Sequence, residues 1–145
     1  MGTKNLLFSK KCVLPVFVFL LIWVFSQVVL AGPQDDWDRL NEEATSLFEN
    51  EKYEEAVAKA ADSVNFAETN FGERSPQRIY SLYVLGSFYF DLGYADEALP
   101  PFLESYRIGR EVQGESHPET LVVKQRIAEI YGTQGKYGEA EKLLK

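Results

Sequence analysis

Residues 114–140 contain Gly-Glu-Ser-His-Pro-Glu-Thr-Leu at 114–121, Ile-Ala-Glu-Ile-Tyr at 127–131 and Gly-Lys-Tyr-Gly-Glu-Ala at 135–140. Landmarks of this stretch also occur 42 positions earlier. The matching pairs are Gly72 and Gly114, Pro76 and Pro118, Leu85 and Ile127, Tyr89 and Tyr131, and Ala98 and Ala140. A fixed period of roughly 20 to 50 residues is typical of stacked repeat arrays. The stretch therefore predicts an array of similar units.

Apolar residues recur at spacings of three and four from Trp37 onward, which is the pattern of one face of a helix. Glycines at 72, 93, 114 and 135 interrupt the pattern, and no stretch alternates long enough for a strand. We therefore predict an all-α fold of antiparallel helix hairpins stacked as a solenoid. Its domain covers 37–145, with repeats at about 37–74, 79–116 and 121–145, the last one incomplete.

Small residues occupy two positions of the repeat. Ala44, Gly86 and Ala128 share the first position, and Ala56, Ala98 and Ala140 share the second. Small side chains at a helix crossing let the two backbones approach, while large neighbours fill the grooves. Stacked pairs can then bury apolar faces that one pair alone leaves exposed.

Two helix starts carry proline after a residue at the N-cap position. Ser75-Pro76 and His117-Pro118 each place proline at the first helical position, where its missing N–H costs nothing. His117 is the only histidine, and we expect it to cap its helix rather than to act in catalysis or bind metal. The adjacent Pro100 and Pro101 should shorten or kink the helix that contains them.

The first 31 residues have the features of a secretory signal peptide. Three lysines precede the apolar run 13–25, and Val29 and Ala31 fit the positions before a cleavage site at Gly32. The run 13–31 is also long enough for an uncleaved membrane anchor. Residues 32–36 would be a short linker. Both alternatives place the remainder outside the cytoplasm, because positive charge before the span stays inside.

Charge and residue types exclude several classes of function. Residues 32–145 carry a formal charge of −10, because the leader contains three lysines and no acid. That charge argues against nucleic acid as the ligand and leaves basic partners as an alternative. The only cysteine, Cys12, lies in the leader, and no phosphate loop or serine-nucleophile motif is present. We expect no enzyme activity, no catalytic residues, no metal and no cofactor.

The repeat resembles the tetratricopeptide repeat, a family of helix-hairpin interaction modules. The resemblance rests on Leu85-Gly86, Tyr89, Gly93, Ala98 and Phe102 in the second repeat, and on Ile127-Ala128, Tyr131, Gly135 and Ala140 in the third. The first repeat fits more loosely. The 42-residue interval and the Gly-x-x-x-Pro linkers look like the longer repeats of kinesin light chains.

The resemblance implies a scaffold that binds a protein or peptide in a concave groove formed by the first helix of each pair. Carried over position by position, the candidate groove residues are Asn41, Thr45, Phe48, Tyr83, Ser87, Phe90, Gln125 and Glu129. Tyr83 and Phe90 would be the apolar anchors. Ordinary solvent exposure is the alternative explanation for these side chains.

We therefore expect an exported or membrane-tethered scaffold, in the periplasm, secreted, or anchored through residues 13–31. Two alternatives stay open. The short last helix leaves Leu143 and Leu144 uncovered, so the array can self-associate through this end. The chain can also be an accessory or truncated part of a longer repeat protein.

Overall fold

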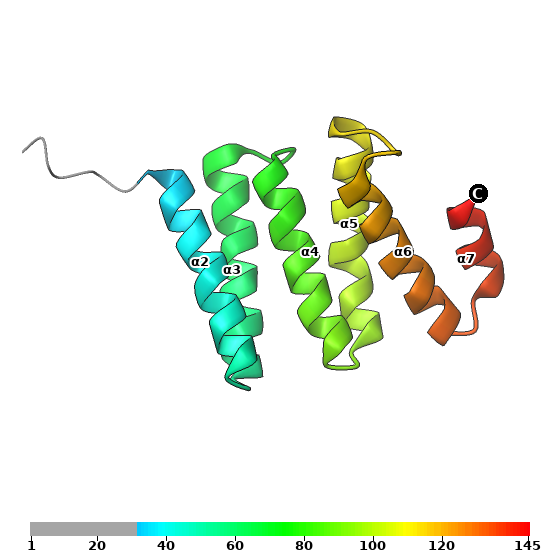
Figure 1. Ribbon diagram of the computed structural model, residues 1–145, viewed down its shortest axis with the longest axis horizontal. Coiled ribbons are helices and arrows are strands. Elements are labelled where there is room, and N and C mark those ends of the chain that lie inside the picture. Colours follow the sequence, from blue (N-terminus) through cyan, green and yellow to red (C-terminus); the bar gives the residue numbers. More distant parts are fainter. Residues whose placement is uncertain (1–31) are drawn as a thin grey trace, which may run out of the picture. The chain divides into compact units, whose positions relative to one another are not determined.

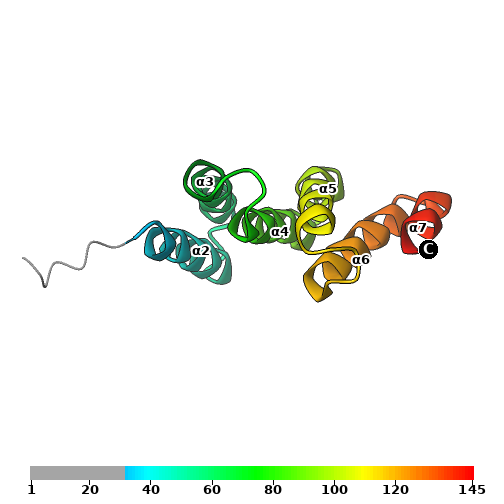
Figure 2. The ribbon, with the colours of Figure 1, turned by 90° about the horizontal axis from the view of Figure 1, so that it is seen from above.

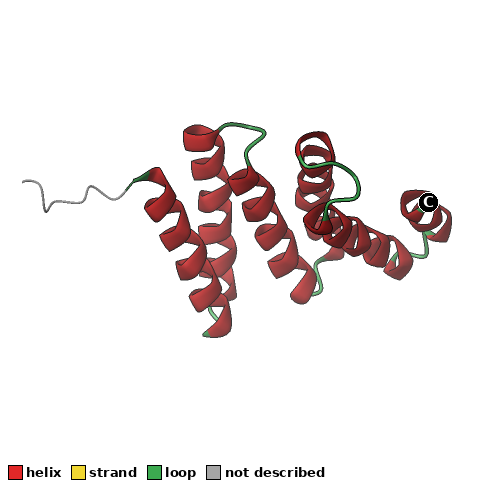
Figure 3. Cartoon of the chain, turned by 45° about the horizontal axis from the view of Figure 1, so that its top comes forward, coloured by secondary structure: helices red, strands yellow, loops and turns green. Residues whose placement is uncertain are grey.

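The computed structural model describes residues 32–145, and these residues form helices and turns without a strand (Figures 1 and 3). This confirms the all-α prediction. The helices in chain order are α2 (Pro33–Glu49), α3 (Tyr53–Phe71), α4 (Pro76–Asp91), α5 (Ala95–Val112), α6 (Pro118–Thr133) and α7 (Tyr137–Leu144). The leader, with its predicted cleavage site or anchor, lies outside the described residues. None of the described helices is long and apolar enough to span a bilayer.

Consecutive helices pair as antiparallel hairpins: α2 with α3, α4 with α5 and α6 with α7. Neighbouring hairpins also touch, through α3 and α4 and through α5 and α6. Viewed from above in Figure 2, α2, α4 and α6 lie in one row, with α3 and α5 in the other. We call α2, α4 and α6 the A helices and α3, α5 and α7 the B helices. The predicted stacking of hairpins is therefore present.

The first helix begins earlier than the apolar pattern indicated. α2 begins at Pro33, so residues 33–36, expected to be a linker, form its first turn. Proline is favoured at the first helical position, and Asp35 and Asp36 place negative charge near the positive helix end. These local preferences extend the helix ahead of Trp37, where the apolar stripe starts.

The turn inside each hairpin uses one residue with a left-handed backbone. The three equivalent residues are Glu51 (φ 61°), Gly93 (φ 83°) and Gly135 (φ 73°). The residue that follows each of them donates its backbone N–H to the carbonyl of the residue five positions earlier in the chain, as from Lys52 to Leu47 at 2.9 Å. The left-handed region disfavours side chains with a Cβ atom, so Glu51 is strained where its counterparts are glycine.

Replacing Glu51 with glycine is expected to raise the free energy of unfolding by about 0.5–1 kcal/mol. The change removes the left-handed penalty of roughly 1–2 kcal/mol. Part of this gain is lost, because glycine gives the unfolded chain more conformational freedom. Urea unfolding followed by circular dichroism measures the difference. Glu49→Gly, in the right-handed end of α2, is the control and should destabilise.

The two linkers between hairpins share a backbone path but differ in their caps. Gly72 (φ 94°) and Gly114 (φ 98°) precede Ser75 and His117, both of which have extended backbones at the N-cap position. The Ser75 hydroxyl accepts a hydrogen bond from the Arg78 N–H at 3.2 Å. The imidazole of His117 makes no capping bond. The expected side-chain cap is therefore made by Ser75 and not by His117.

The core consists of apolar side chains from neighbouring hairpins. Phe102, Ile127 and Ile130 are fully buried and lie in one cluster with Ala98. The predicted close approaches are present: Ala44 is fully buried, and Gly86 lies against the Phe102 ring. Ala140 is only half-buried, because the described chain provides no further helix beside it. Packing of large against small residues thus holds the hairpins together.

α5 runs without a break through its two prolines, so the expected shortening did not occur. The helix extends from Ala95 to Val112 with Pro100 and Pro101 inside it. The flanking Ala98 and Phe102 are both fully buried, and Pro100 is exposed. Burial of these flanking residues favours the helical path, and the carbonyls that lose an N–H partner belong to exposed Asp96 and Glu97.

A closed ring of hydrogen bonds crosses the first three helices. The indole Nε1 of Trp37 donates to Ser81 Oγ at 2.8 Å, and Ser81 lies 2.8 Å from Ser63 Oγ. Ser63 donates to Asn41 Oδ1 at 3.0 Å, and Asn41 Nδ2 donates to the Trp37 carbonyl at 2.7 Å. Ser63 and Ser81 are fully buried, so the ring satisfies polar groups that water cannot reach.

Arg78 connects the helices α3, α4 and α5. Its guanidinium contacts Glu68 at 3.2 Å and Glu104 at 3.1 Å, and it donates to the carbonyl of Glu73 at 3.1 Å. Arg107 also binds Glu104 at 2.9 Å. These two arginines outweigh the partial burial of Glu104 and lower its pKa to about 2.

The depressed pKa of Glu104 predicts a loss of stability in acid. Unfolding lets Glu104 take up a proton near its ordinary pKa of about 4.3. The stabilisation is therefore complete above about pH 5 and is lost as the pH falls toward 2. Glu104→Gln should lower stability at neutral pH and give a flatter pH profile between these limits. Urea unfolding at several pH values measures both; parallel profiles would contradict the assignment.

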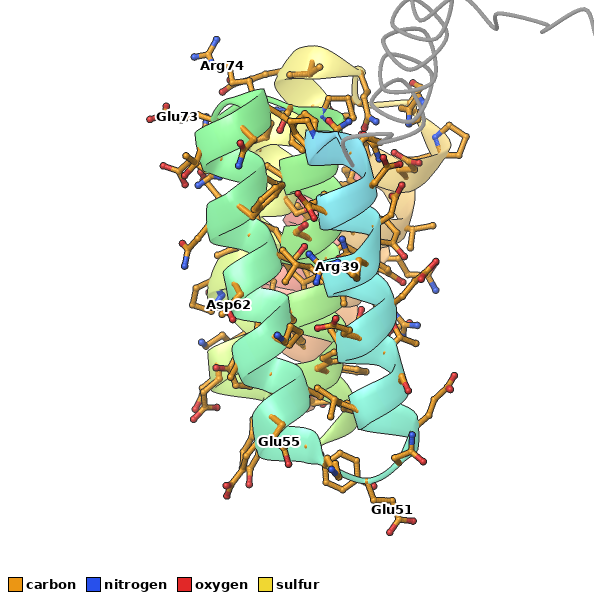
Figure 4. The ribbon with its side chains drawn as sticks, turned by 90° about the vertical axis from the view of Figure 1, so that its left-hand side faces the viewer. Arg39, Glu51, Glu55, Asp62, Glu73 and Arg74 are labelled. Carbon is orange, nitrogen blue, oxygen red and sulfur yellow. The ribbon has the colours of Figure 1, made fainter. Side chains whose placement is uncertain are left out.

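The two ends of the array have different surfaces. Charged side chains such as Arg39, Glu55 and Asp62 cover the α2–α3 end (Figure 4). At the other end α7 has no buried residue, and Tyr137 and Leu144 are 72% and 59% exposed. The α2–α3 surface suits solvent, while the α7 surface exposes two large apolar side chains among charged ones.

Candidate functional site

Three hollows lie on the face formed by the A helices, and we name them by their chemistry. The acidic hollow lies along α2 and is lined by Asp38, Glu42, Thr45, Glu49 and Tyr80, among others. The apolar hollow, about 180 Å³, lies between α4 and α6 and is lined by Ile79, Tyr80, Tyr83, Glu119, Val122 and Val123. The Ser87 hollow, about 200 Å³, is lined by Thr45, Tyr83, Ser87, Phe90, Asp91 and Arg126, with the neighbouring Val84 and Phe88.

Shared residues join the three hollows into one surface. Tyr80 lines both the acidic and the apolar hollow. Tyr83 lines both the apolar and the Ser87 hollow, and Thr45 lines both the Ser87 and the acidic hollow. We call this continuous surface the A-helix groove. It reaches all three A helices, so stacking of the hairpins is what assembles it.

Tyr83 lies at the centre of the groove and is held by the core. Its ring packs against the buried Phe102 at a centroid distance of 5.9 Å. Four residues along α4, the Ser87 hydroxyl is buried and has no hydrogen-bond partner among the described residues. A buried hydroxyl without a partner is costly, so a ligand group or a water molecule that bonds to it gains free energy.

Arg126 provides the one positive charge among the residues that line these hollows. Its guanidinium lies 5.6 Å from the centre of the Phe90 ring and binds Glu129 at 3.0 Å. Burial lowers the pKa of Arg126, but hydrogen bonds and charges from Glu129 and Tyr83 outweigh it, and the pKa is raised. The guanidinium therefore stays charged and is held over the ring.

The structure brings four of the eight predicted groove residues together. Thr45, Tyr83, Ser87 and Phe90 all line the Ser87 hollow. Glu129 lies beside them through its bond to Arg126. The described structure thus provides a surface at the position that the resemblance indicated.

The other three predicted residues have different environments. Asn41 lines the wall of the acidic hollow but is only 8% exposed. Its amide nitrogen donates to the Trp37 carbonyl and its amide oxygen accepts from Ser63, so both polar atoms are already used in the closed ring of hydrogen bonds. Phe48 stacks on Phe88 at 4.3 Å between α2 and α4, in the core. Gln125 is exposed and donates to Glu129 at 3.2 Å, outside the three linings.

Sequence reasoning missed Tyr80, Val122, Asp91 and Arg126, although the period could have found them. Positions 38, 80 and 122 are equivalent in the repeat, as are 42, 84 and 126, and 49, 91 and 133. Members of each set line the groove from different A helices. The prediction used only the repeat positions of Asn41, Thr45 and Phe48. Adding the positions equivalent to 38, 42 and 49 would have included all four missed residues.

The groove provides contacts for binding. It offers tyrosine and phenylalanine rings, a buried hydroxyl, carboxylates and one guanidinium. Within residues 32–145, no three potential metal-binding side chains of histidine, cysteine, aspartate or glutamate lie together.

Comparison with family models gives a match over the second half of the chain. Residues 78–145 match the family model described as tetratricopeptide repeat. The described helices have the helix-hairpin fold of tetratricopeptide repeats. Tetratricopeptide repeats imply a scaffold for protein–protein interaction. No curated protein sequence matches this chain.

Solved structures share the fold of the described helices. The crystal structure of BtubC (BKLC) from P. vanneervenii superposes with a TM-score of 0.70 at 13% identity, covering 81% of this chain and 46% of that one. A Podosopora anserina kinesin light chain with nearly identical TPR-like repeats gives 0.67 at 23% identity, covering 79% and 54%. A variant of that protein gives 0.63 at 21% identity, covering 89% and 61%. The chain thus spans about half the length of these proteins, and at these identities the likeness shows the fold alone.

Proposed function

We propose that the tetratricopeptide-repeat domain binds an extended segment of a partner protein in the A-helix groove. The observation that carries the proposal is the continuity of the groove across α2, α4 and α6, with Tyr83 at its centre. Aromatic side chains at the centre of an interface provide much of its binding free energy. The unpaired Ser87 hydroxyl offers a hydrogen bond to a peptide backbone.

Substitution of the two anchors tests this function. The full-length chain is screened against a display library of random peptides, and its ligands are titrated against Tyr83→Ala/Phe90→Ala. We expect at least about a tenfold loss of affinity, because a central aromatic contributes roughly 2 kcal/mol or more. The matched control is Tyr94→Ala/Tyr137→Ala, which removes two exposed tyrosines outside the three linings. Equal loss in both double variants would contradict binding in the groove.

We propose further that the domain acts outside the cytoplasm, either released after cleavage before Gly32 or held by an uncleaved anchor. The lysine-first leader and its apolar run support this localisation. Fractionation of cells that express the full chain with a C-terminal tag, followed by N-terminal sequencing, tests it. Recovery of the full-length chain in the cytoplasm would contradict the proposal.

Self-association through α7 is the second candidate function. The observation that favours it is the exposure of Tyr137 and Leu144 on a helix without a buried residue. Sedimentation of the full chain over a range of concentrations measures it. A monomer at the highest concentration would reject this candidate.

A further inference from the structure

We propose that the A-helix groove selects a cationic partner segment, in which lysine or arginine residues flank an apolar anchor. This inference rests on the proposed function and adds the chemistry of the ligand. It concerns the charges around the groove, which the repeat fold itself does not specify.

Most carboxylates of the groove lack a cationic partner. Glu42, Glu49 and Asp91 form no ion pair with any cation among the described residues. Asp38 accepts a hydrogen bond from the neutral amide of Gln34, at 3.0 Å, and Glu119 from that of Gln113, at 2.8 Å. All five line the groove, so their charges are available to a ligand.

Most cations of the domain form ion pairs with carboxylates that do not line the groove. Arg78 and Arg107 bind Glu104, Lys124 binds Glu115, and Lys59 binds Glu43. Arg126 is the only cation in the three linings, and Glu129 already neutralises it. A hollow lined by one sign of charge concentrates the field and attracts ligands of opposite sign.

The carboxylates along α2 have a spacing that suits an extended segment. Asp38 and Glu42 are one turn apart, a rise of about 6 Å along a helix. Alternate side chains of an extended chain lie about 6.6 Å apart. A segment aligned with α2 can therefore present two basic side chains, two residues apart, to these two carboxylates.

Aromatic rings lie directly beside the carboxylates. Tyr80 is 49% exposed and shares the acidic hollow with Asp38 and Glu42. A basic side chain that reaches these carboxylates can also lie over the tyrosine ring, where a cation is attracted to the π face. The adjoining apolar hollow, with Tyr83 and Val122, takes the apolar anchor.

An acidic segment fits the groove poorly. It would meet one guanidinium that is already paired, together with five carboxylates that have no cationic partner among the described residues. Like charges across an interface suppress association. Preferential binding of acidic peptides would therefore contradict the proposal most directly.

The test uses the full-length chain and three peptide sets that share one apolar anchor and carry basic, neutral or acidic flanks. Affinity is measured by fluorescence anisotropy at about 0.02 M and about 0.3 M salt, because salt screens exposed charges. We expect the basic set to bind most tightly and to lose affinity as salt rises. Glu42→Gln/Glu49→Gln should weaken it about three- to tenfold at low salt, as expected for two exposed ion pairs.

The control variant removes the same charge elsewhere. Glu54→Gln/Asp62→Asn changes two residues of the B helix α3, neither of which has an ion pair among the described residues, and should change affinity by less than about twofold. Glutamine and asparagine preserve side-chain size, and circular dichroism checks that all variants keep their helices.

Other results would contradict either the charge preference or binding in the groove. Preference for acidic or neutral peptides, with binding lost in Tyr83→Ala/Phe90→Ala, overturns the charge proposal and leaves the groove function intact. Equal weakening by the α3 control shows a general charge effect and also overturns it. Peptide binding that survives Tyr83→Ala/Phe90→Ala overturns the proposed function itself.

Discussion

Replacing Phe102 with alanine is expected to lower the free energy of unfolding by about 3–5 kcal/mol. Phe102 is fully buried in α5 and lies in the cluster that joins the second and third hairpins, with Ile127 and Ile130. Its removal leaves a cavity that the surrounding helices cannot fill completely. Urea unfolding followed by helical circular dichroism measures the loss.

Gly86 provides a sharper test of the same contact. A Cβ atom at Gly86 would lie 2.9 Å from ring atoms of Phe102, closer than normal packing allows. Gly86→Ala should therefore destabilise the protein, although alanine gains up to about 1 kcal/mol in helix propensity. In the Phe102→Ala background the space is free, so the same change should stabilise.

The control for this reversal is Gly132→Ala. Gly132 lies in α6, and a Cβ atom there would meet nothing within 4 Å. The substitution should stabilise by a few tenths to about 1 kcal/mol in both backgrounds. A Gly86→Ala effect that keeps the same sign with and without the Phe102 ring would show that the ring is not what excludes a side chain.

Replacing Ser81 with alanine should cost about 1–3 kcal/mol, the second-largest effect that we expect on stability. Ser81 is fully buried and accepts from Trp37 while it bonds to Ser63. Without its hydroxyl, the Trp37 N–H loses its acceptor and Ser63 loses one partner. The cost arises mainly from these unsatisfied groups, because the volume removed is small.

A double-mutant cycle separates the hydrogen bond from general packing. Trp37→Phe removes the donor but keeps an aromatic ring beside Tyr80. If the bond carries the effect, Ser81→Ala should cost less by about 0.5 kcal/mol or more when Trp37 is already phenylalanine. Chemical denaturation of the four proteins gives the coupling free energy. Identical costs in both backgrounds would show that the ring of hydrogen bonds contributes nothing measurable.

Helix positions could be predicted because their signals are local. Apolar spacing of three and four residues gives a helix face, and left-handed glycines mark the turns after α4 and α6. Pro76 and Pro118 fix two helix starts. The turn at Glu51 shows the limit: the backbone follows the glycine positions of the other repeats, because packing of α2 on α3 imposes the same path.

The groove could be predicted only in part, because a repeat position does not determine whether a side chain lines the groove or forms hydrogen bonds inside the domain. Tyr83, Ser87 and Phe90 line the groove as the resemblance implied. Asn41 occupies the position equivalent to Tyr83, yet its amide bonds to Ser63 and to the Trp37 carbonyl. Those partners are 22 residues later and four residues earlier in the chain, and no local pattern links them to Asn41.

The sequence by itself determined the helices, their pairing and the 42-residue register, because each depends on neighbours within a few turns or on exact repetition. Tertiary structure alone decided that Arg126 lies over Phe90, that Ser87 keeps an unpaired hydroxyl and that the carboxylates of α2 adjoin Tyr80. The contacts of Arg126 with Phe90 and of the α2 carboxylates with Tyr80 join residues of different hairpins. They exist only once stacking brings the A helices together, since contacts between distant segments depend on packing geometry rather than on local sequence.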